Sequence, residues 1–367
     1  MRKHHNQSVR RHSLRRHYSE RDKGKQDKKR AILTGILFLA VIAAVAVGAW
    51  ALEEKLFPAL SGKEDERQPS TRQILKLGGK KYITGHGQFE TFLFMGTDLS
   101  GNPEGEGEDY QGRMADYLAL FIINRKEETC SVLQMNRDTI TDITLLQADG
   151  SGNASADIQL CTAHWYGGNP QMSCENTADA VSRMLGGLKI DGYYELPMDA
   201  IADLNDVVGG VTLAIKGDFT AVDPAMKEGK TLTLSGEQAF HYVHDRQNVG
   251  DGENLFRLER QKQYLQAYMD KVTAAASEKP EFLLEIFEKF KEVSVTDITD
   301  NVVTKIARRA HQYENKGIYE FEGNAKPGQA LGDGEDHMEF YPDNDSVIEV
   351  MTELYALEEY HTGGEEE

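Results

Sequence analysis

The sequence predicts an α/β fold: a three-layer α-β-α sandwich with a central mixed sheet, preceded by one transmembrane helix. Apolar, β-rich runs alternate with helical patterns, and the connections are long enough for crossovers, which together predict the sandwich. A long uncharged run near the N-terminus predicts the transmembrane helix. We therefore divide the chain into a basic tail (1–30), a membrane span (31–52), a linker (53–73), a folded domain (74–356) and an acidic disordered tail (357–367).

The predicted membrane span is an uncharged run of about 22 residues, from Ala31 to Leu52. A helix of about 20 apolar residues crosses the hydrocarbon core of a bilayer. The run is longer than the apolar region of a cleaved signal peptide, and charged residues (53–55) follow it directly. We therefore expect a retained single-pass anchor.

Charge is divided unevenly along the chain. Residues 1–30 carry twelve Lys and Arg against three acidic residues, a net +9, and because the whole chain is −19, the part after the span is −28. The positive-inside rule then places the N-terminus in the cytoplasm and the large domain outside the cell membrane. The acidic bulk argues against nucleic acid as a partner, whereas the basic tail can contact anionic membrane lipid.

The strands of the domain are predicted from short runs rich in β-branched and aromatic residues. These runs are 91–95, 117–123, 130–135, 140–145, 193–196 and 211–215. The helices are predicted from apolar residues at helical spacing, with a proline before the second helix and a capping pattern at Ser235 before the third. The helical segments are 176–185, 198–207, 235–243, 255–274, 282–290, 302–313 and 346–356.

Three cysteines lie in the predicted domain. Cys161 and Cys174 flank a turn-rich stretch and could close a 12-residue loop, which an extracytoplasmic setting permits. We expect these two to be bridged and Cys130, inside an apolar run, to be a buried free thiol. The absence of a CxxC motif and of a nearby cluster of ligands argues against a structural zinc site.

Two aspartates flank a loop rich in glycine and acidic residues. Asp98 follows the apolar run FLFMGT, and Asp116 opens the next run. Ligand sites of α/β sheets gather at the carboxyl ends of strands, so both carboxylates could bind one Mg²⁺ or similar cation. The alternative is that Asp98 caps a turn and Asp116 pairs with Arg113.

Basic and amide side chains form two further groups. Arg137 ends the run SVLQMN. An unpaired charge so close to the core has a high desolvation cost, so we expect Arg137 to be paired or functional. An internal ion pair with Asp138 is the alternative to a functional role. Arg246 leaves one helix, and Arg257 and Gln261 share one face of the next helix at i and i+4. These donors suit a dianionic group. The alternative is that they form an ordinary charged helix surface. Residues 259 and 260 are expected to face solvent.

Six segments in order resemble the LytR-CpsA-Psr family over about residues 92–264. They are FLFMGTD, GRMADYLALFIIN, SVLQMNRDT, IDGYYELPMDAIADLNDVVGGVTL, LSGEQAFHYVHDR and FRLERQ. The resemblance implies a phosphotransferase that moves a glycopolymer from a polyprenyl-pyrophosphate carrier onto peptidoglycan, outside the cell membrane. It also implies an apolar pocket for the polyprenyl tail, which we place near Leu204, Val207 and Leu265.

By position, the resemblance assigns roles to the residues above. Asp98 and Asp116 match the residues that bind Mg²⁺ or another divalent cation. The catalytic role is assigned to Asp116, Arg137 and Arg246. The residues matched to pyrophosphate binding are Arg113, Arg137, His244, Arg246, Arg257 and Gln261.

His244 departs from the family pattern, which usually has an Arg-x-Arg pair where this chain has His244-Asp245-Arg246. Histidine donates well to phosphate only when protonated, near or below a pKa of about 6.5. We therefore expect a weaker grip on pyrophosphate at neutral pH. The departure also leaves open the alternative of a non-catalytic protein that binds polyprenyl pyrophosphate or wall glycan.

Overall fold

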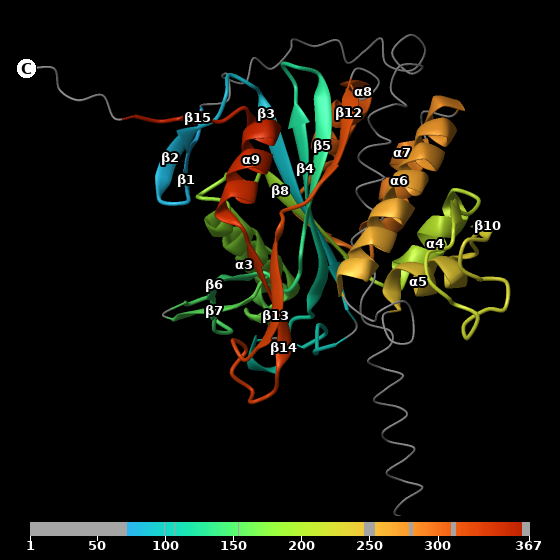
Figure 1. Ribbon diagram of the computed structural model, residues 1–367, viewed down its shortest axis with the longest axis horizontal. Coiled ribbons are helices and arrows are strands. Elements are labelled where there is room, and N and C mark those ends of the chain that lie inside the picture. Colours follow the sequence, from blue (N-terminus) through green and yellow to red (C-terminus); the bar gives the residue numbers. More distant parts are fainter. Residues whose placement is uncertain are drawn as a thin grey trace, which may run out of the picture.

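The computed structural model describes residues 72–98, 100–105, 107–152, 154–245, 254–278, 282–309 and 313–361 (Figure 1). The predicted basic tail, the membrane span and nearly all of the linker lie outside these residues. Within the described part of the chain, none of the helices combines the length and the apolar character that crossing a membrane requires.

The centre of the domain is a six-stranded sheet with the order β11-β8-β3-β4-β5-β12. β4 is antiparallel to both β3 and β5, whereas β8 runs parallel to β3 and β12 runs parallel to β5, so the sheet is mixed, as predicted. The strands are β3 (Phe89–Thr97), β4 (Ala115–Asn124), β5 (Thr129–Met135), β8 (Gly192–Pro197), β11 (Val295–Thr296) and β12 (Glu314–Tyr319).

Side chains of the central strands alternate between two apolar cores, one on each face of the sheet. Phe92 and Phe94 of β3 belong to one core, and Leu93 and Met95 belong to the other. Because both faces are covered, the strands read as nearly continuous apolar runs, which is why the sequence predicted them.

Helices cover each face of the sheet, so the fold has three layers (Figure 1). One face carries η3 (Leu160–Trp165), α3 (Pro170–Met184) and α9 (Asn344–Tyr355). The other face carries α4 (Ala200–Val207), α5 (Gly236–His244), α6 (Asn254–Glu278), α7 (Phe282–Lys291) and α8 (Asp300–Arg309).

Local sequence explains where two of these helices begin. The Ser235 hydroxyl accepts from the Gln238 backbone and the Gln238 side chain accepts from the Ser235 backbone, so the predicted capping box is present. α3 begins at Pro170, earlier than predicted, because Asn169 caps it by accepting from the Met172 backbone N–H at 2.9 Å.

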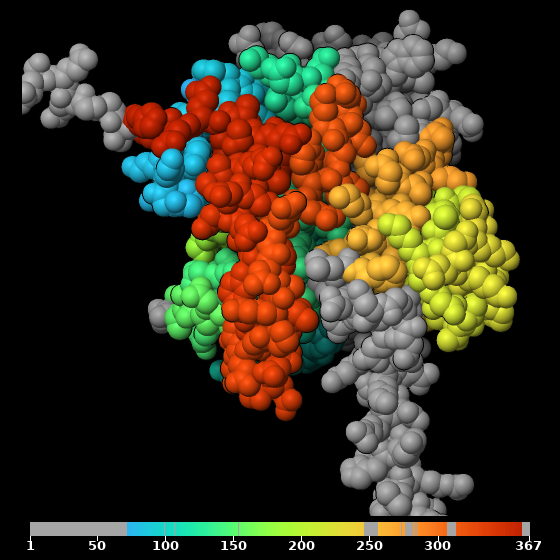
Figure 2. All heavy atoms as spheres, in the orientation of Figure 1, coloured from blue at the N-terminus to red at the C-terminus, as the bar shows by residue number. Residues whose placement is uncertain are grey.

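Several short strands form small sheets around the central one. They are β1 (Ile74–Leu77) with β2 (Lys80–Ile83) and β15 (Glu358–Glu359), β6 (Ile140–Thr144) with β7 (Ser155–Gln159), β9 (Thr212–Ala214) with β10 (Thr231–Thr233), and β13 (Gly323–Gly328) with β14 (His337–Pro342). Figure 2 shows the β13–β14 hairpin running down one face of the molecule below α9.

The C-terminal boundary differs from the prediction. β1 begins at Ile74, where we started the domain, but β15 lies inside the segment 357–367 that we expected to be disordered. Leu357 is buried, and the Tyr360 N–H donates to the Lys81 carbonyl at 2.8 Å. Pairing with the edge of β2 therefore extends the fold through residue 361.

Candidate functional site

Asp98, Asp116 and Arg137 come together at one edge of the central sheet. Asp98 directly follows β3, Asp116 is the second residue of β4, and Arg137 lies just after β5. Because β4 is antiparallel to both neighbours, the end of β3, the start of β4 and the end of β5 share this edge. The sequence predicted this convergence for the two aspartates.

An ion pair joins Arg137 Nη1 and Asp116 Oδ1 at this edge. Only 1% of the Asp116 side chain and 16% of the Arg137 side chain are exposed. Arg137 Nε also contacts Asp138 Oδ1 at 3.2 Å, so the internal pair that we weighed is present as well. We had considered Arg113 as the ion-pair partner of Asp116, but the partner in the structure is Arg137.

Arg137 stays cationic despite its surroundings. Burial alone would lower its pKa, but the neighbouring Cys161, Asp138 and Asp98 raise it above its ordinary value. The guanidinium therefore carries a permanent positive charge next to the carboxylates of Asp98, Asp116 and Asp138 at the sheet edge.

Asp98 has a structural task in addition to any ligand role. Its Oδ1 accepts from the Ser100 hydroxyl at 2.5 Å, the Ser100 N–H at 3.1 Å and the Met114 N–H at 2.9 Å. The turn-capping alternative is therefore present, and these three donors fix the carboxylate close to Arg137.

The residues at this edge fit a divalent cation. Both carboxylate oxygens of Asp116 are buried and accept no hydrogen bond from the described residues, apart from the ion pair with Arg137. A buried carboxylate oxygen without a donor is costly unless a cation or ligand satisfies it. Asp116, with Asp98 beside Arg137, offers the hard oxygen ligands that Mg²⁺ takes.

Arg113 lies on the loop that leads into β4 and is only partly exposed. Its charge acts on Glu195, and its Nε is buried without a hydrogen-bond partner among the described residues. Gly112 lets this loop approach η3, because a Cβ at that position would lie 1.9 Å from the His164 carbonyl oxygen. The glycine before Arg113 is therefore a packing requirement.

The second predicted group lies at the junction of α5 and α6. His244, Arg257 and Gln261 are all buried, and Gln261 Nε2 donates to the Val243 carbonyl at 3.3 Å. Arg257 is close enough to His244 to lower the pKa of the histidine. Arg246, which we assigned to catalysis, lies outside the described residues.

Arg260 is the clearest error of our sequence interpretation, because it is buried and not exposed to solvent. Its guanidinium donates to the backbone carbonyls of Tyr242 and Asp245, the latter at 2.5 Å, and lies 5.0 Å above the Phe219 ring. It therefore satisfies carbonyl groups at the end of α5 that have no partner within the helix.

His244 is buried, its ring stacks on Phe240 at 4.9 Å, and its Nδ1 contacts Asp245 Oδ1 at 2.5 Å. Burial lowers its pKa below the ordinary value, although Asp245 works in the opposite direction. His244 therefore becomes positively charged only at a pH below the ordinary histidine pKa of about 6.5 that we used above.

The predicted disulfide is wrong, because all three cysteines are free. Cys161 in η3 lies next to Arg137: its backbone N–H donates to the Arg137 carbonyl at 3.0 Å, and burial raises the pKa of its thiol to about 11. Cys174 in α3 instead contacts His164 and Glu195. The sequence carried no signal for the Cys161–Arg137 contact, which depends on how η3 packs beneath the sheet edge.

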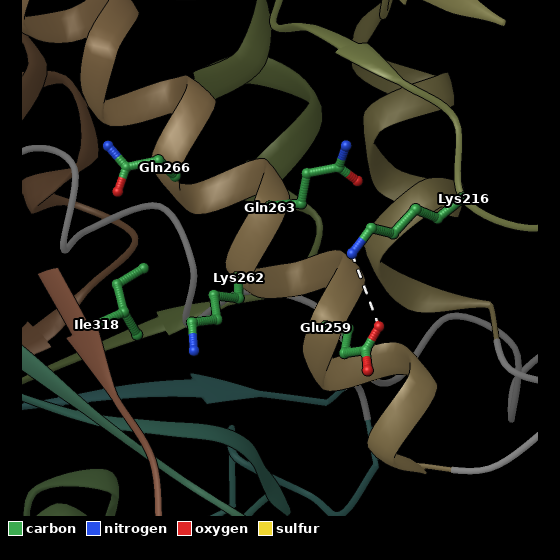
Figure 3. Close-up of a pocket in the computed structure, with 6 residues that line it drawn as sticks. All are labelled: Lys216, Glu259, Lys262, Gln263, Gln266 and Ile318. Carbon is green, nitrogen blue, oxygen red and sulfur yellow. Dashed lines mark ion pairs between the residues drawn. The ribbon is translucent and has the colours of Figure 1, made fainter. Parts of the chain in front are cut away.

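The residues that we named for an apolar pocket lie in one core of the domain. Leu204 and Leu265 are buried in that core, and Val207 packs against it. A hollow of about 270 Å³ lies beside α6 (Figure 3). It is lined by Lys216, Glu259, Lys262, Gln263, Gln266 and Ile318. A polyprenyl pocket thus stays a prediction.

The chain matches one family model and is similar to several known proteins. The model of the LytR_cpsA_psr family matches residues 62–355. The polyisoprenyl-teichoic acid–peptidoglycan teichoic acid transferase TagU of Halalkalibacterium halodurans is 29% identical over 44% of this chain and 48% of its own length. The polyisoprenyl-teichoic acid–peptidoglycan teichoic acid transferase TagT of Bacillus subtilis is 29% identical over 67% of this chain and 71% of its own length.

The chain thus spans about half the length of the first of these relatives. Among solved structures, protein gbs0355 of Streptococcus agalactiae matches with a TM-score of 0.58 at 20% identity, over 75% of this chain and 90% of that one. This likeness shows that the two proteins share a fold.

Proposed function

The chain belongs to the LytR_cpsA_psr family, and we propose that it is a phosphotransferase that moves a glycopolymer from a polyprenyl-pyrophosphate carrier onto peptidoglycan. The two relatives named above are transferases of teichoic acid to peptidoglycan. The observation that carries the proposal is the convergence of Asp98, Asp116 and Arg137 at one sheet edge, with a buried acid beside a permanent cation.

The proposed reaction is a phosphoryl transfer. A peptidoglycan hydroxyl loses its proton, which passes to solvent, and its oxygen attacks the sugar-proximal phosphorus. The bond from that phosphorus to the bridging oxygen breaks, and polyprenyl phosphate leaves. The polymer remains attached through a phosphodiester. In such reactions the protein acts mainly by positioning the reactants and neutralising charge.

We assign a separate role to each group of residues. Asp98 and Asp116 would hold Mg²⁺ or another divalent cation, which screens the charge of the pyrophosphate when bound. Arg137 supplies fixed positive charge where negative charge develops in the transition state. Arg113, Arg246, Arg257 and Gln261 are proposed to orient the pyrophosphate oxygens, while His244, neutral at pH 7, contributes at most as a neutral donor or acceptor.

The proposed location follows from sequence charge. The span at 31–52 would anchor the chain in the cell membrane, with the basic tail in the cytoplasm against anionic lipid and the domain outside. Protease added to wall-stripped intact cells is expected to degrade the domain and spare the tail. Protection of the domain would contradict this topology and the wall substrate.

The experiment that tests the function measures release of polyprenyl phosphate from a lipid-linked glycopolymer in the presence of peptidoglycan and Mg²⁺. We expect turnover by the wild-type chain and none above background by Asp116→Asn. Arg125→Ala is the matched control, because Arg125 pairs with Glu90 at the opposite end of β3 and β4. Binding of the lipid-linked polymer without release would favour the alternative, a non-catalytic binding protein.

A further inference from the structure

Three side chains from separate elements meet beneath the Arg113 loop. His164 of η3, Cys174 of α3 and Glu195 of β8 each turn one ligand atom toward a common point, and these atoms lie within 4.8 Å of one another. The distances are 3.6 Å from Cys174 Sγ to His164 Nε2, 3.5 Å from Cys174 Sγ to Glu195 Oε2, and 3.7 Å from His164 Nε2 to Glu195 Oε2.

These distances match the separations between neighbouring ligand atoms in a tetrahedral zinc site. Bonds of about 2.3 Å to sulfur and about 2.0–2.1 Å to nitrogen and oxygen, at tetrahedral angles, place the ligand atoms about 3.3–3.6 Å apart. The triangle formed by His164, Cys174 and Glu195 therefore accepts an ion with little rearrangement.

A nucleophilic relay would need a different arrangement. In such a relay the thiol and the carboxylate contact opposite nitrogens of the imidazole, so that the acid orients the base. Here both Cys174 and Glu195 face the same nitrogen, Nε2 of His164. All three side chains are buried, so a substrate does not reach the thiol.

The outer atoms of two of these side chains are held by their neighbours. His164 Nδ1 lies 3.1 Å from the Arg113 carbonyl, and an N–H donated there leaves a lone pair on Nε2. The Thr97 hydroxyl donates to Glu195 Oε1 at 2.7 Å, which leaves Oε2 facing the cluster. Metal-binding histidines and carboxylates are characteristically oriented by such second contacts.

Charge is also compatible with a divalent ion at this point. An ion of charge +2 bound by the Cys174 thiolate, the Glu195 carboxylate and a neutral His164 would make a cluster of zero net charge, and the ligands release their protons as the metal binds.

We propose that His164, Cys174 and Glu195 supply three ligands of a site for a divalent transition metal, with zinc as the best match. Thiolate and imidazole ligands select zinc over Mg²⁺, so this site differs in kind from the carboxylates of Asp98 and Asp116. The cysteine spacing argued against zinc because the ligands lie far apart in the sequence and only the fold brings them together.

The metal would join η3, α3 and β8 behind the sheet edge. Through the carbonyl of Arg113 it would also fix the loop that carries this arginine, next to the close approach that Gly112 allows. The site goes beyond the proposed function and does not depend on it.

The test uses the full chain, purified in mild detergent, stripped with a chelator and titrated with Co²⁺ alone. We expect a near-ultraviolet thiolate-to-cobalt charge-transfer band that saturates at one equivalent and disappears when Zn²⁺ is added. Cys174→Ser is expected to lose the band. Cys130→Ser is the matched control, because Cys130 is also a buried free thiol, and this variant should keep it.

His164→Gln retains the thiol and is expected to weaken Co²⁺ binding by more than about tenfold. Asp116→Asn should keep the band, which separates this site from the cation site of the proposed function. Absence of the band in the folded wild-type chain, as judged by circular dichroism, would overturn the proposal even if a variant failed to fold. A band of equal strength in Cys174→Ser would do the same.

Discussion

The sheet edge and the α5–α6 junction both gather buried charged groups, but they use them differently. At the sheet edge Arg137 pairs with Asp116, whose carboxylate accepts no hydrogen bond from the described residues. At the junction Arg260 and Gln261 donate to backbone carbonyls of α5 and of the residue that follows it.

This difference suggests that the sheet edge serves the reaction, whereas the backbone contacts at the α5–α6 junction stabilise the fold. A side chain that donates to backbone carbonyls stabilises the helix end, and its loss should first be felt as a loss of stability. A buried acid paired only with a cation retains the capacity to bind a metal or to respond to a phosphate. We therefore expect the catalytic effects of substitution to be largest at the sheet edge.

Arg137→Ala should, together with Asp116→Asn, have the largest effect on activity. Removing a transition-state donor lowers the rate by roughly 100- to 1,000-fold. It also leaves Asp116 buried without its partner, which should cost about 3–5 kcal/mol in the free energy of unfolding. Release of polyprenyl phosphate and denaturant unfolding measure the two losses.

A double variant separates those losses. Arg137→Ala combined with Asp116→Asn removes the uncompensated charge, so stability should recover in large part while activity stays lost. Recovery of activity in the double variant would show that Arg137 serves only to neutralise Asp116.

Arg260→Met should affect stability more than catalysis. The substitution keeps an apolar side chain against Phe219 but leaves the carbonyls of Tyr242 and Asp245 without their donor. We expect a loss of about 2–4 kcal/mol in the free energy of unfolding, with activity per folded molecule nearly unchanged. A fall in activity as large as that of Arg137→Ala would break the distinction between the two regions.

The sequence was most informative where burial dictates composition. β3, β4 and β5 are covered on both faces and were therefore visible as apolar runs. The sheet-edge residues could be predicted for a related reason, because charged groups directly after such runs must lie at the strand ends.

Other features depend on tertiary contacts that leave no local pattern. β15 consists of two exposed glutamates and exists because the edge of β2 was open. Arg260 looked like a surface residue because its partners are backbone carbonyls, which any sequence provides. Cys161 and Cys174 looked like a pair because their spacing was suitable, but η3 and α3 direct the thiols to different partners.

The junction also predicts how stability depends on pH. Because the pKa of His244 is lowered in the folded state, the unfolded chain binds more protons in mild acid, and the free energy of unfolding should fall as pH drops below about 6.5. His244→Phe should flatten this slope, which for a single titrating group is at most about 1.4 kcal/mol per pH unit.

Thermal unfolding between pH 7.5 and pH 5 measures the slope. His241 and Asp245 face the same group, so His241→Phe is the matched control and should leave a residual slope. If the wild-type chain became more stable toward pH 5, His244 would instead be stabilised as a cation.

Ser100→Ala should have the smallest effect at the sheet edge. The hydroxyl is one of three donors to Asp98 Oδ1, and the backbone N–H groups of Ser100 and Met114 remain after the substitution. We therefore expect a loss of no more than about 1.5 kcal/mol in stability, and a rate much closer to wild type than that of Asp116→Asn. Steady-state rates across a Mg²⁺ titration provide the measurement. If Asp98 only caps its turn, Ser100→Ala should change unfolding without changing the Mg²⁺ concentration at half-maximal rate; a shift in that concentration would show that the carboxylate held by Ser100 contributes to the cation site.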